Sequence, residues 1–362
     1  MASAAASPAR WLADRGVLLH VGPPKTGTTA LQTALAAAAP ELQALGVSYP
    51  VRPPTTQHGR AAAALLQRRM AGSASVQPME SWTRLAHRAS GRVDRLVISS
   101  ELFADLQPEH IERAADDLGR GDLHVLITLR PLESVLASTW QQDIKGGRAQ
   151  DFDRWLHDRL DQPGTGPFWL RHTHDALVDR WIEAVGPQRV CVLLVDSTRP
   201  QALLREAERL IGIPEGILVP TAANRSMSAP EAELLVQFTA RHGQDRDVEL
   251  FQRLIRLGGF RAMVENRAPG AHEPRISTPA WAVRRARELY APMARRVLES
   301  GARIIGDPEL LTPSGEPDPE DAQPSTSGLV PIDAAVELAL GIYRAAQTQI
   351  AASRSRGESL AP

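Results

Sequence analysis

Residues 17–32 read VLLHVGPPKTGTTALQ, and this stretch decides the fold. A short apolar piece leads into a turn of glycine and proline, after which come a lysine, several threonines and a second glycine. The segment 30–39, rich in alanine and leucine, then has the composition of a helix. This order predicts a strand, a loop and a helix N-terminus. Because the first N–H groups of a helix are unpaired and its dipole is positive there, such a loop binds phosphate-like anions.

The loop supplies several kinds of anion donor. Gly27 lets the backbone come close to an anion, and Lys25 adds a point charge. The threonines add hydroxyl groups. We therefore predict that a phosphate-like group is bound by Pro24, Lys25, Thr26, Gly27, Thr28 and Thr29.

The order of residues in the loop differs from the Walker A motif, in which the lysine follows the second glycine. Here Lys25 precedes Gly27. The order Pro-Lys-Thr-Gly-Thr-Thr-x-Leu-Gln instead resembles the 5′-phosphosulfate loop of sulfotransferases. The resemblance implies that the co-substrate is 3′-phosphoadenosine 5′-phosphosulfate (PAPS). It also implies that Lys25 stabilises the charge on the departing phosphate, with no metal required.

Composition limits the other possible functions. The chain has 362 residues, of which 43% are hydrophobic and 23% charged, with a formal net charge of −1. This balance offers no basic field for nucleic acid or an anionic membrane surface. The one cysteine, Cys191, lies in an apolar run and is expected to be buried. Residues 1–15 lack the apolar core of a signal peptide, and no apolar run is long enough for a membrane span, so we expect a cytoplasmic protein.

Further apolar runs predict a parallel sheet. They occupy residues 96–100, 123–129 and 190–195, and helix-like segments lie between them. Strands that alternate with helices are typical of an α/β fold, here a three-layer sandwich around a central parallel sheet. We expect P-loop-like topology, with helical insertions around 60–69 and 82–89 that form part of the acceptor pocket.

The domain organisation follows from changes in composition. We expect a flexible N-terminus over residues 1–15, one catalytic domain over 16–311, and a Pro/Ser-rich linker over 312–330. A helix should follow over 331–352. Its apolar face docks either on the domain or on a partner, and the sequence leaves both open, together with the oligomeric state.

A second motif follows the predicted strand 123–129. Arg130 ends that strand, and Pro131 suits the first turn of a helix. In sulfotransferases an arginine at this strand end and a serine about eight residues later hold the 3′-phosphate of the nucleotide. Arg130 and Ser138 match that spacing, and the resemblance further implies a nucleotide contact for Arg225. An arginine fork and a hydroxyl both suit a phosphate dianion.

Two further segments are weaker candidates for contacts with the acceptor or the nucleotide. Gln142 and Lys145 either line the acceptor cleft or form a solvated last helical turn, where a lysine is favoured by the dipole. The run Gly258-Gly259-Phe260-Arg261 is only a loose analogue of the nucleotide-binding Gly-x-x-Gly-x-Lys segment of aryl sulfotransferases.

Sulfuryl transfer also needs a base that takes a proton from the acceptor hydroxyl. Two residues qualify by position. His58 follows the first strand–helix unit, and Glu101 follows the predicted strand 96–100. His20 lies in or beside the first strand and is interpreted as a hydrogen-bonded structural histidine. The other histidines show no metal-ligand spacing, so no metal is expected.

The leading hypothesis is a sulfotransferase that moves a sulfuryl group from PAPS to an acceptor hydroxyl. Resemblance to bacterial carbohydrate-type members implies that the hydroxyl belongs to a glycan or a glycosylated small molecule. One alternative is a P-loop kinase or nucleotidase, which would need a Walker A lysine and a magnesium-binding acid. The other is a catalytically inactive relative that only binds nucleotide.

Overall fold

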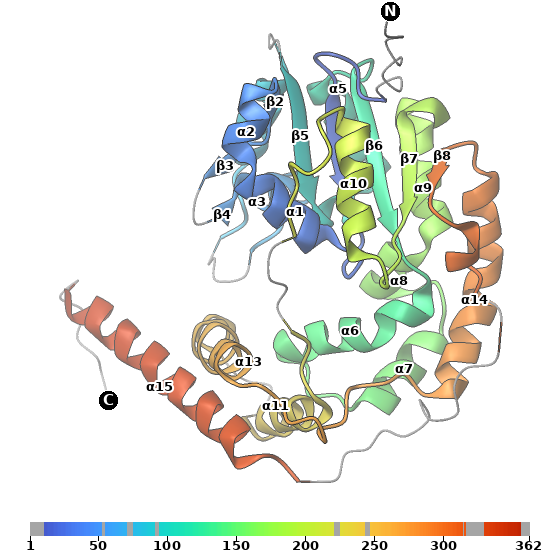
Figure 1. The fold of residues 1–362 in the computed structure, drawn as a ribbon. Helices are drawn as coiled ribbons and strands as arrows, with labels where there is room; N and C mark the ends of the chain where they lie inside the picture. The colour runs from blue at the N-terminus through green and yellow to red at the C-terminus, as the bar shows by residue number, and fades with distance from the viewer. Residues whose placement is uncertain are drawn as a thin grey trace, which may run out of the picture.

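The fold is built around one parallel sheet. The computed structural model describes residues 11–52, 55–70, 75–90, 94–220, 225–242, 247–313, 315 and 329–355. These residues form a six-stranded sheet in the order β2-β5-β1-β6-β7-β8, all parallel (Figure 1). Its strands are β1 (Val17–Val21), β2 (Val47–Ser48), β5 (Arg95–Ser100), β6 (Leu123–Leu129), β7 (Val190–Leu194) and β8 (Arg303–Ile305). The predicted α/β fold with a central parallel sheet is confirmed.

The sheet is covered on both faces. Along β1, Val17, Leu19 and Val21 belong to one buried cluster, whereas Leu18 belongs to another. This alternation places successive side chains on opposite faces of the strand. One face carries α1 (Thr28–Ala37), α2 (Ala39–Ala44) and α10 (Pro200–Ile211), and the other carries α3 (Gln57–Leu65), α4 (Glu80–Ala86), α5 (Pro108–Leu118) and α9 (His174–Val185). The molecule therefore has the three layers that were expected.

The sequence missed the short elements. Strands β2 and β8 contain only 2 and 3 residues, too few to make an apolar run. The hairpin of β3 (Val51–Arg52) and β4 (Thr55–Thr56) is equally short. Thr173 separates α8 (Gly166–His172) from α9. Helix α12 (Val248–Phe251) continues as the π-helix η4 (Gln252–Phe260).

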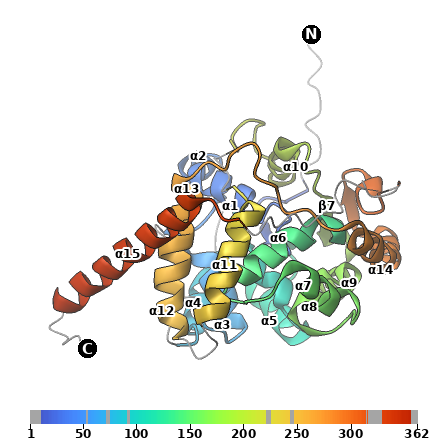
Figure 2. The ribbon, with the colours of Figure 1, turned by 90° about the horizontal axis from the view of Figure 1, so that it is seen from below.

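A second group of helices lies beyond the carboxyl ends of the strands (Figures 1 and 2). Its first member, α6 (Leu132–Lys145), starts where β6 ends, two residues after Arg130. The others are α7 (Phe152–Leu160), α8, α11 (Ala229–His242), α12, η4 and α13 (Arg261–Asn266). Helix α14 (Ala280–Glu299) runs from this group back along the sheet towards β8 (Figure 1). Since ligands of open α/β sheets bind at the carboxyl edge, this arrangement places the candidate site between the sheet and these helices.

The chain ends depart in part from the predicted boundaries. Residues 1–10 of the expected flexible N-terminus lie outside the described residues. Its last part packs on the domain: Leu12 is buried and donates its N–H to the carbonyl of Leu210 at 3.2 Å. Most of the expected linker, 314 and 316–328, also lies outside the described residues. The predicted last helix is present as α15 (Ile332–Ser355).

Three glycines bring α15 into close contact with η4. A Cβ on Gly259 would lie 2.8 Å from the carbonyl oxygen of Leu338, and one on Gly341 would lie 2.6 Å from that of Gly258. Side chains at these positions would push the two helices apart. Gly258 and Gly259 are thus explained by helix packing, and not as an analogue of a nucleotide-binding loop. No described helix is both long and apolar enough to cross a membrane.

Candidate functional site

The predicted anion loop connects β1 to α1, and its backbone is tightly constrained. Gly27 precedes α1 with a φ of 88°, and a Cβ there would lie 2.6 Å from Leu203. Lys25 also has a positive φ, of 73°, although it is not a glycine. Such a conformation costs about 1–3 kcal/mol and is commonly found at ligand sites. The loop therefore has the local strain expected of a binding loop.

The three threonines of the loop have different surroundings. Thr26 Oγ1 donates to the carbonyl of Pro23 and contacts Thr128 Oγ1, both at 2.8 Å, so this hydroxyl ties the loop to β6. Its predicted role as an anion donor is limited to its backbone N–H. Thr28 Oγ1 is buried and has no hydrogen-bond partner among the described residues, and Thr29 is exposed. Thr28 is the hydroxyl that an anion would satisfy.

Lys25 and Glu101 are brought together at this edge of the sheet. Burial lowers the pKa of Lys25, and the positive charge of Arg256 lowers it further, while Glu101 opposes both. Burial raises the pKa of Glu101, against the opposing charges of Lys25 and Arg171. Glu101 begins the short helix η2 (Glu101–Asp105), directly after β5. Two of the predicted catalytic residues thus interact electrostatically.

Arg130 joins the second motif to the first. Its Nη1 donates to the carbonyl oxygen of Lys25 at 3.1 Å, so the guanidinium lies against the anion loop. Burial lowers the pKa of this arginine. A half-buried cation without a carboxylate partner among the described residues can bind an anion.

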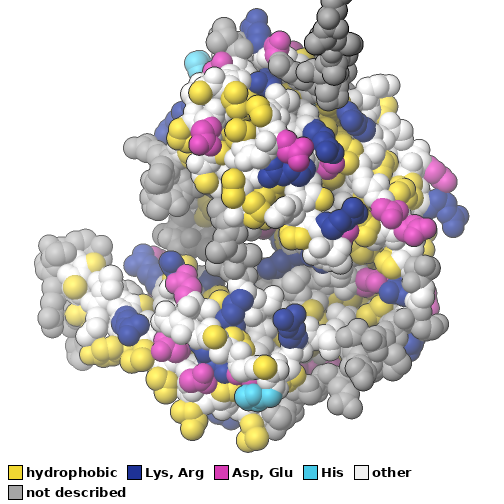
Figure 3. Space-filling view, in the orientation of Figure 1, with side chains coloured by type: hydrophobic (Ala, Val, Ile, Leu, Met, Phe, Trp, Pro, Cys, Tyr) yellow, Lys and Arg dark blue, Asp and Glu magenta, His cyan; other side chains and the backbone are white. Residues whose placement is uncertain are grey.

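Two further cations belong to the same group. Lys145, at the end of α6, has a pKa lowered to about 8 by burial and by the charges of Lys25 and Arg256. Its Nζ lies 4.6 Å from the centre of the Phe260 ring. Sequence reasoning missed Arg256, because an arginine inside η4 belongs to no motif. Figure 3 shows a hollow between the sheet and the helices below it, with basic side chains within.

Helix α6 separates two clefts. The larger, of about 580 Å³, is lined by Ser134, Ser138 and Gln141 on one face of α6 and by residues from 225–228 and 269–276. The smaller, of about 340 Å³, is lined by Pro24 of the anion loop and by Gln142. Both volumes suit small-molecule sites. The other residues of the smaller cleft are Thr139, Asp143, Arg148, Asp158, Arg159, Thr165, Gly166, Pro167, Phe168, Arg171 and His172.

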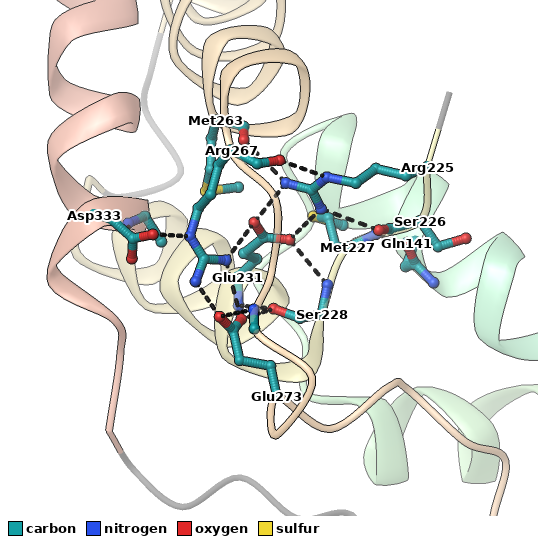
Figure 4. A network of polar contacts seen from close by, with 12 residues as sticks. Gln141, Arg225, Ser226, Met227, Ser228, Glu231, Met263, Arg267, Glu273 and Asp333 are labelled. Carbon is teal, nitrogen blue, oxygen red and sulfur yellow. Dashed lines mark hydrogen bonds and ion pairs between the residues drawn. The ribbon is translucent and has the colours of Figure 1, made fainter. Parts of the chain in front are cut away.

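Arg225 lines the larger cleft, but its guanidinium is already used (Figure 4). Two of its N–H groups bind the buried carboxylate of Glu231, at 2.7 Å each. The other three donate to backbone carbonyls of described residues, namely Ser226, Met263 and Arg267. Because an arginine has five N–H groups, none is left for a phosphate. The expectation of a nucleotide contact from this side chain does not fit this geometry.

Arg275 offers a cation where Arg225 does not. It lines the larger cleft, its side chain is exposed, and it has no side-chain partner among the described residues. The sequence contained no signal for it, since it lies in an irregular segment far from either motif. Its backbone pairs with Ser228 in an isolated bridge, which fixes its place in the cleft that Ser138 also lines.

None of the described contacts of His58 reaches the anion loop. It is fully buried, and its Nδ1 accepts the backbone N–H of Ser99 at 3.1 Å. Burial lowers its pKa to about 4, and its ring meets that of Tyr49 edge-on at 4.8 Å. In the neutral ring the only acceptor nitrogen is therefore occupied. Like Lys25, Glu101 and Arg130, His58 lines neither of the two clefts described above, but those three residues interact with one another at the anion loop.

Two other histidines differ from His58. His20 is fully buried between Ser99 Oγ at 2.8 Å and Thr128 Oγ1 at 3.1 Å, which confirms it as a hydrogen-bonded structural residue. His172 lines the smaller cleft, and its buried Nδ1 has no partner among the described residues. The described histidines, cysteine and acidic residues form no group of three that could hold a metal ion.

Among solved structures, the chain is similar to a sulfotransferase from Alicyclobacillus acidocaldarius, at 20% sequence identity and a TM-score of 0.40. The match covers 62% of this chain and 91% of that chain. No protein-family model matches the chain, and no curated protein matches it. At this level of likeness, any assignment of function has to rest on the chain's own residues.

Proposed function

We propose that the protein transfers a sulfuryl group from PAPS to an acceptor hydroxyl. The observation that carries this proposal is the convergence of Lys25, Glu101 and Arg130 on one anion loop at the carboxyl edge of the sheet. The order of residues in the loop, with the lysine ahead of the glycine, favours a phosphosulfate over the triphosphate of a P-loop kinase.

The nucleotide would extend from the anion loop, against which Arg130 lies, into the larger cleft. Ser138 faces this cleft, and its hydroxyl, which now donates to the carbonyl of Val135 at 3.0 Å, can rotate to a phosphate oxygen. We assign the 3′-phosphate to Arg130 and Ser138. Arg275 would provide the charge that the fully bonded Arg225 cannot.

The transfer step needs one base and one group that stabilises the leaving charge. The acceptor oxygen attacks sulfur, the bond from sulfur to the 5′-phosphate oxygen breaks, and that oxygen keeps the electron pair. Lys25 would stabilise the charge that develops on it. Glu101 would take the proton of the acceptor, because it interacts with Lys25 and burial raises its pKa above the ordinary glutamate value.

The acceptor would enter the smaller cleft, on the other side of α6. Pro24 connects this cleft to the anion loop, and its lining combines an amide, hydroxyls and charged groups of both signs. Such a lining suits a hydroxyl-rich molecule better than a flat phenol, because many polar groups can be hydrogen-bonded there. We therefore favour a glycan or a glycosylated small molecule as acceptor.

Two measurements test this function. Calorimetry should show that 3′-phosphoadenosine 5′-phosphate (PAP) binds more tightly than ATP, and labelled PAPS should transfer its sulfuryl group to members of an acceptor panel. Lys25→Ala should reduce turnover about a hundredfold or more, which is the usual loss for an oriented electrostatic group. Tighter binding of ATP with Mg²⁺ would instead support the kinase alternative. PAP binding with full turnover in a folded Lys25→Ala variant would remove Lys25 from the mechanism.

A further inference from the structure

Helix α15 has two apolar faces, and the described part of the chain covers only one of them. Its inner face packs on η4 and α13, and Ala334, Leu338 and Gly341 are buried there. Its outer face carries Val336, exposed by 47%, and Tyr343, exposed by 60%. The helix projects from the body in Figures 1 and 2, and hydrophobic side chains follow its edge in Figure 3. The remaining exposed apolar residues of this helix are Ile332, Leu340 and Ile350.

The outer face has the spacing of a coiled-coil seam. Positions 336, 340, 343, 347 and 350 follow one another in steps of four, three, four and three residues. This is a heptad pattern, in which every second step returns to the same side of the helix. The one polar member, Gln347, donates to the hydroxyl of Tyr343 at 2.9 Å. An ordinary solvated helix face would not repeat large apolar residues in this register.

The charges beside the seam make the helix complementary to itself. Glu337 and Arg344 follow Val336 and Tyr343 directly, and therefore flank the seam on the same side, one heptad apart. In an antiparallel pair of helices this flank meets its own counterpart, so Glu337 would face Arg344 of the second copy, twice. In a parallel pair it would face the opposite flank, where Ala339 and Ala346 carry no charge.

We propose that two copies of the chain associate through α15, packed antiparallel along this seam. Leu340 then lies against Tyr343 of the second copy, and each such contact is flanked by a Glu337–Arg344 pair. The helix has 24 residues, which corresponds to a length of about 36 Å. The partner is a second copy because both the seam and its charges match themselves under a twofold axis. This inference does not depend on the proposed function.

Charge reversal tests the arrangement with the full-length protein. Sedimentation velocity over a range of concentrations should show a monomer–dimer equilibrium. Glu337→Arg alone, or Arg344→Glu alone, turns two attractive pairs into two repulsive ones and should weaken the dimer about tenfold. The double variant exchanges the charges and should restore the wild-type dissociation constant. Glu337 also accepts a hydrogen bond from Asn266 of its own copy. Adding Arg344→Glu cannot restore that hydrogen bond, so a recovered dissociation constant reports the contact between copies.

Two variants complete the experiment. Leu340→Asp should give a monomer of normal circular dichroism, because this exposed side chain contributes little to the fold. Glu299→Arg makes the same charge change at an exposed position of α14 and should leave the dimer unaffected. A wild-type protein that is monomeric at all concentrations would overturn the proposal. So would a dimer that tolerates the single reversals or is not recovered by the double one.

Discussion

Lys25 combines a strained backbone, with a φ of 73°, and a half-buried ammonium group that interacts electrostatically with Glu101. Its own carbonyl is held by Arg130. At this scale the site consists of a cation for the leaving group, a carboxylate beside it and an arginine that orders the loop. Which residue takes the proton of the acceptor is a question about two side chains, Glu101 and His58.

We expect Glu101→Gln to abolish most turnover, and His58→Asn to leave it within a few-fold. The glutamine amide that replaces the carboxylate could no longer accept a proton, whereas an asparagine in place of His58 can still accept the N–H of Ser99. The rate of the wild-type protein should rise with pH through a group whose pKa lies above the ordinary glutamate value of 4.5. This limb of the pH profile should disappear in Glu101→Gln.

PAP affinity serves as the control for both variants, because a base acts on the acceptor and not on the nucleotide. If His58→Asn loses the limb and Glu101→Gln keeps it, the two roles are reversed. If neither variant changes the rate, His172 in the smaller cleft becomes the residue to substitute next.

At the scale of elements, one ion-pair network connects several helices (Figure 4). Glu231 of α11 is fully buried and binds both Arg225 and Arg267. Arg267 in turn binds Glu273 and, through Asp333, the start of α15. Burial alone would raise the pKa of Glu231, but the two arginines hold it below the ordinary value. The network fixes the wall of the larger cleft.

We therefore predict that two arginines of that wall contribute to different properties, Arg225 to stability and Arg275 to ligand affinity. Arg225→Ala should lower the free energy of unfolding by about 2 kcal/mol, because it leaves part of a buried carboxylate unpaired. Arg275→Ala should leave stability unchanged and weaken PAP about tenfold, with little effect on adenosine 5′-phosphosulfate, which lacks the 3′-phosphate. Urea titration and calorimetry measure the two effects. Equal losses of affinity for both ligands would show that Arg275 does not contact the 3′-phosphate.

For the molecule as a whole, several buried histidines link stability to pH. Burial lowers the pKa of His20 to about 3 and those of His58 and His174 to about 4. The unfolded chain therefore binds more protons than the folded one below the ordinary value of 6.5. The contribution of these histidines to the free energy of unfolding is complete above pH 6.5, and it is lost as the pH falls towards 4. A histidine shifted this far contributes on the order of 3 kcal/mol over that range.

We expect the urea midpoint to fall steadily between pH 6.5 and pH 4.5. His58→Asn should flatten part of this dependence, because it removes one of the groups and keeps an acceptor for Ser99. An exposed histidine replaced in the same way, His87→Asn, is the matched control. A midpoint that does not change over this range would contradict the coupling.

The sequence by itself determined the parts that depend on neighbouring residues. The strand, loop and helix of residues 17–37 and the helix after Arg130 follow from local periodicity and from backbone hydrogen bonds within each element. The tertiary structure alone decided which side chains are free to act. Arg225 and Thr26 bind partners distant along the chain. His58 is enclosed, and Arg256 of η4 lowers the pKa of Lys25 in the anion loop. The sequence of α15 does not distinguish its two apolar faces, and only the tertiary structure shows that η4 covers one of them. The physical reason is that a donor's availability depends on every group packed around it, and those groups are brought there by the fold.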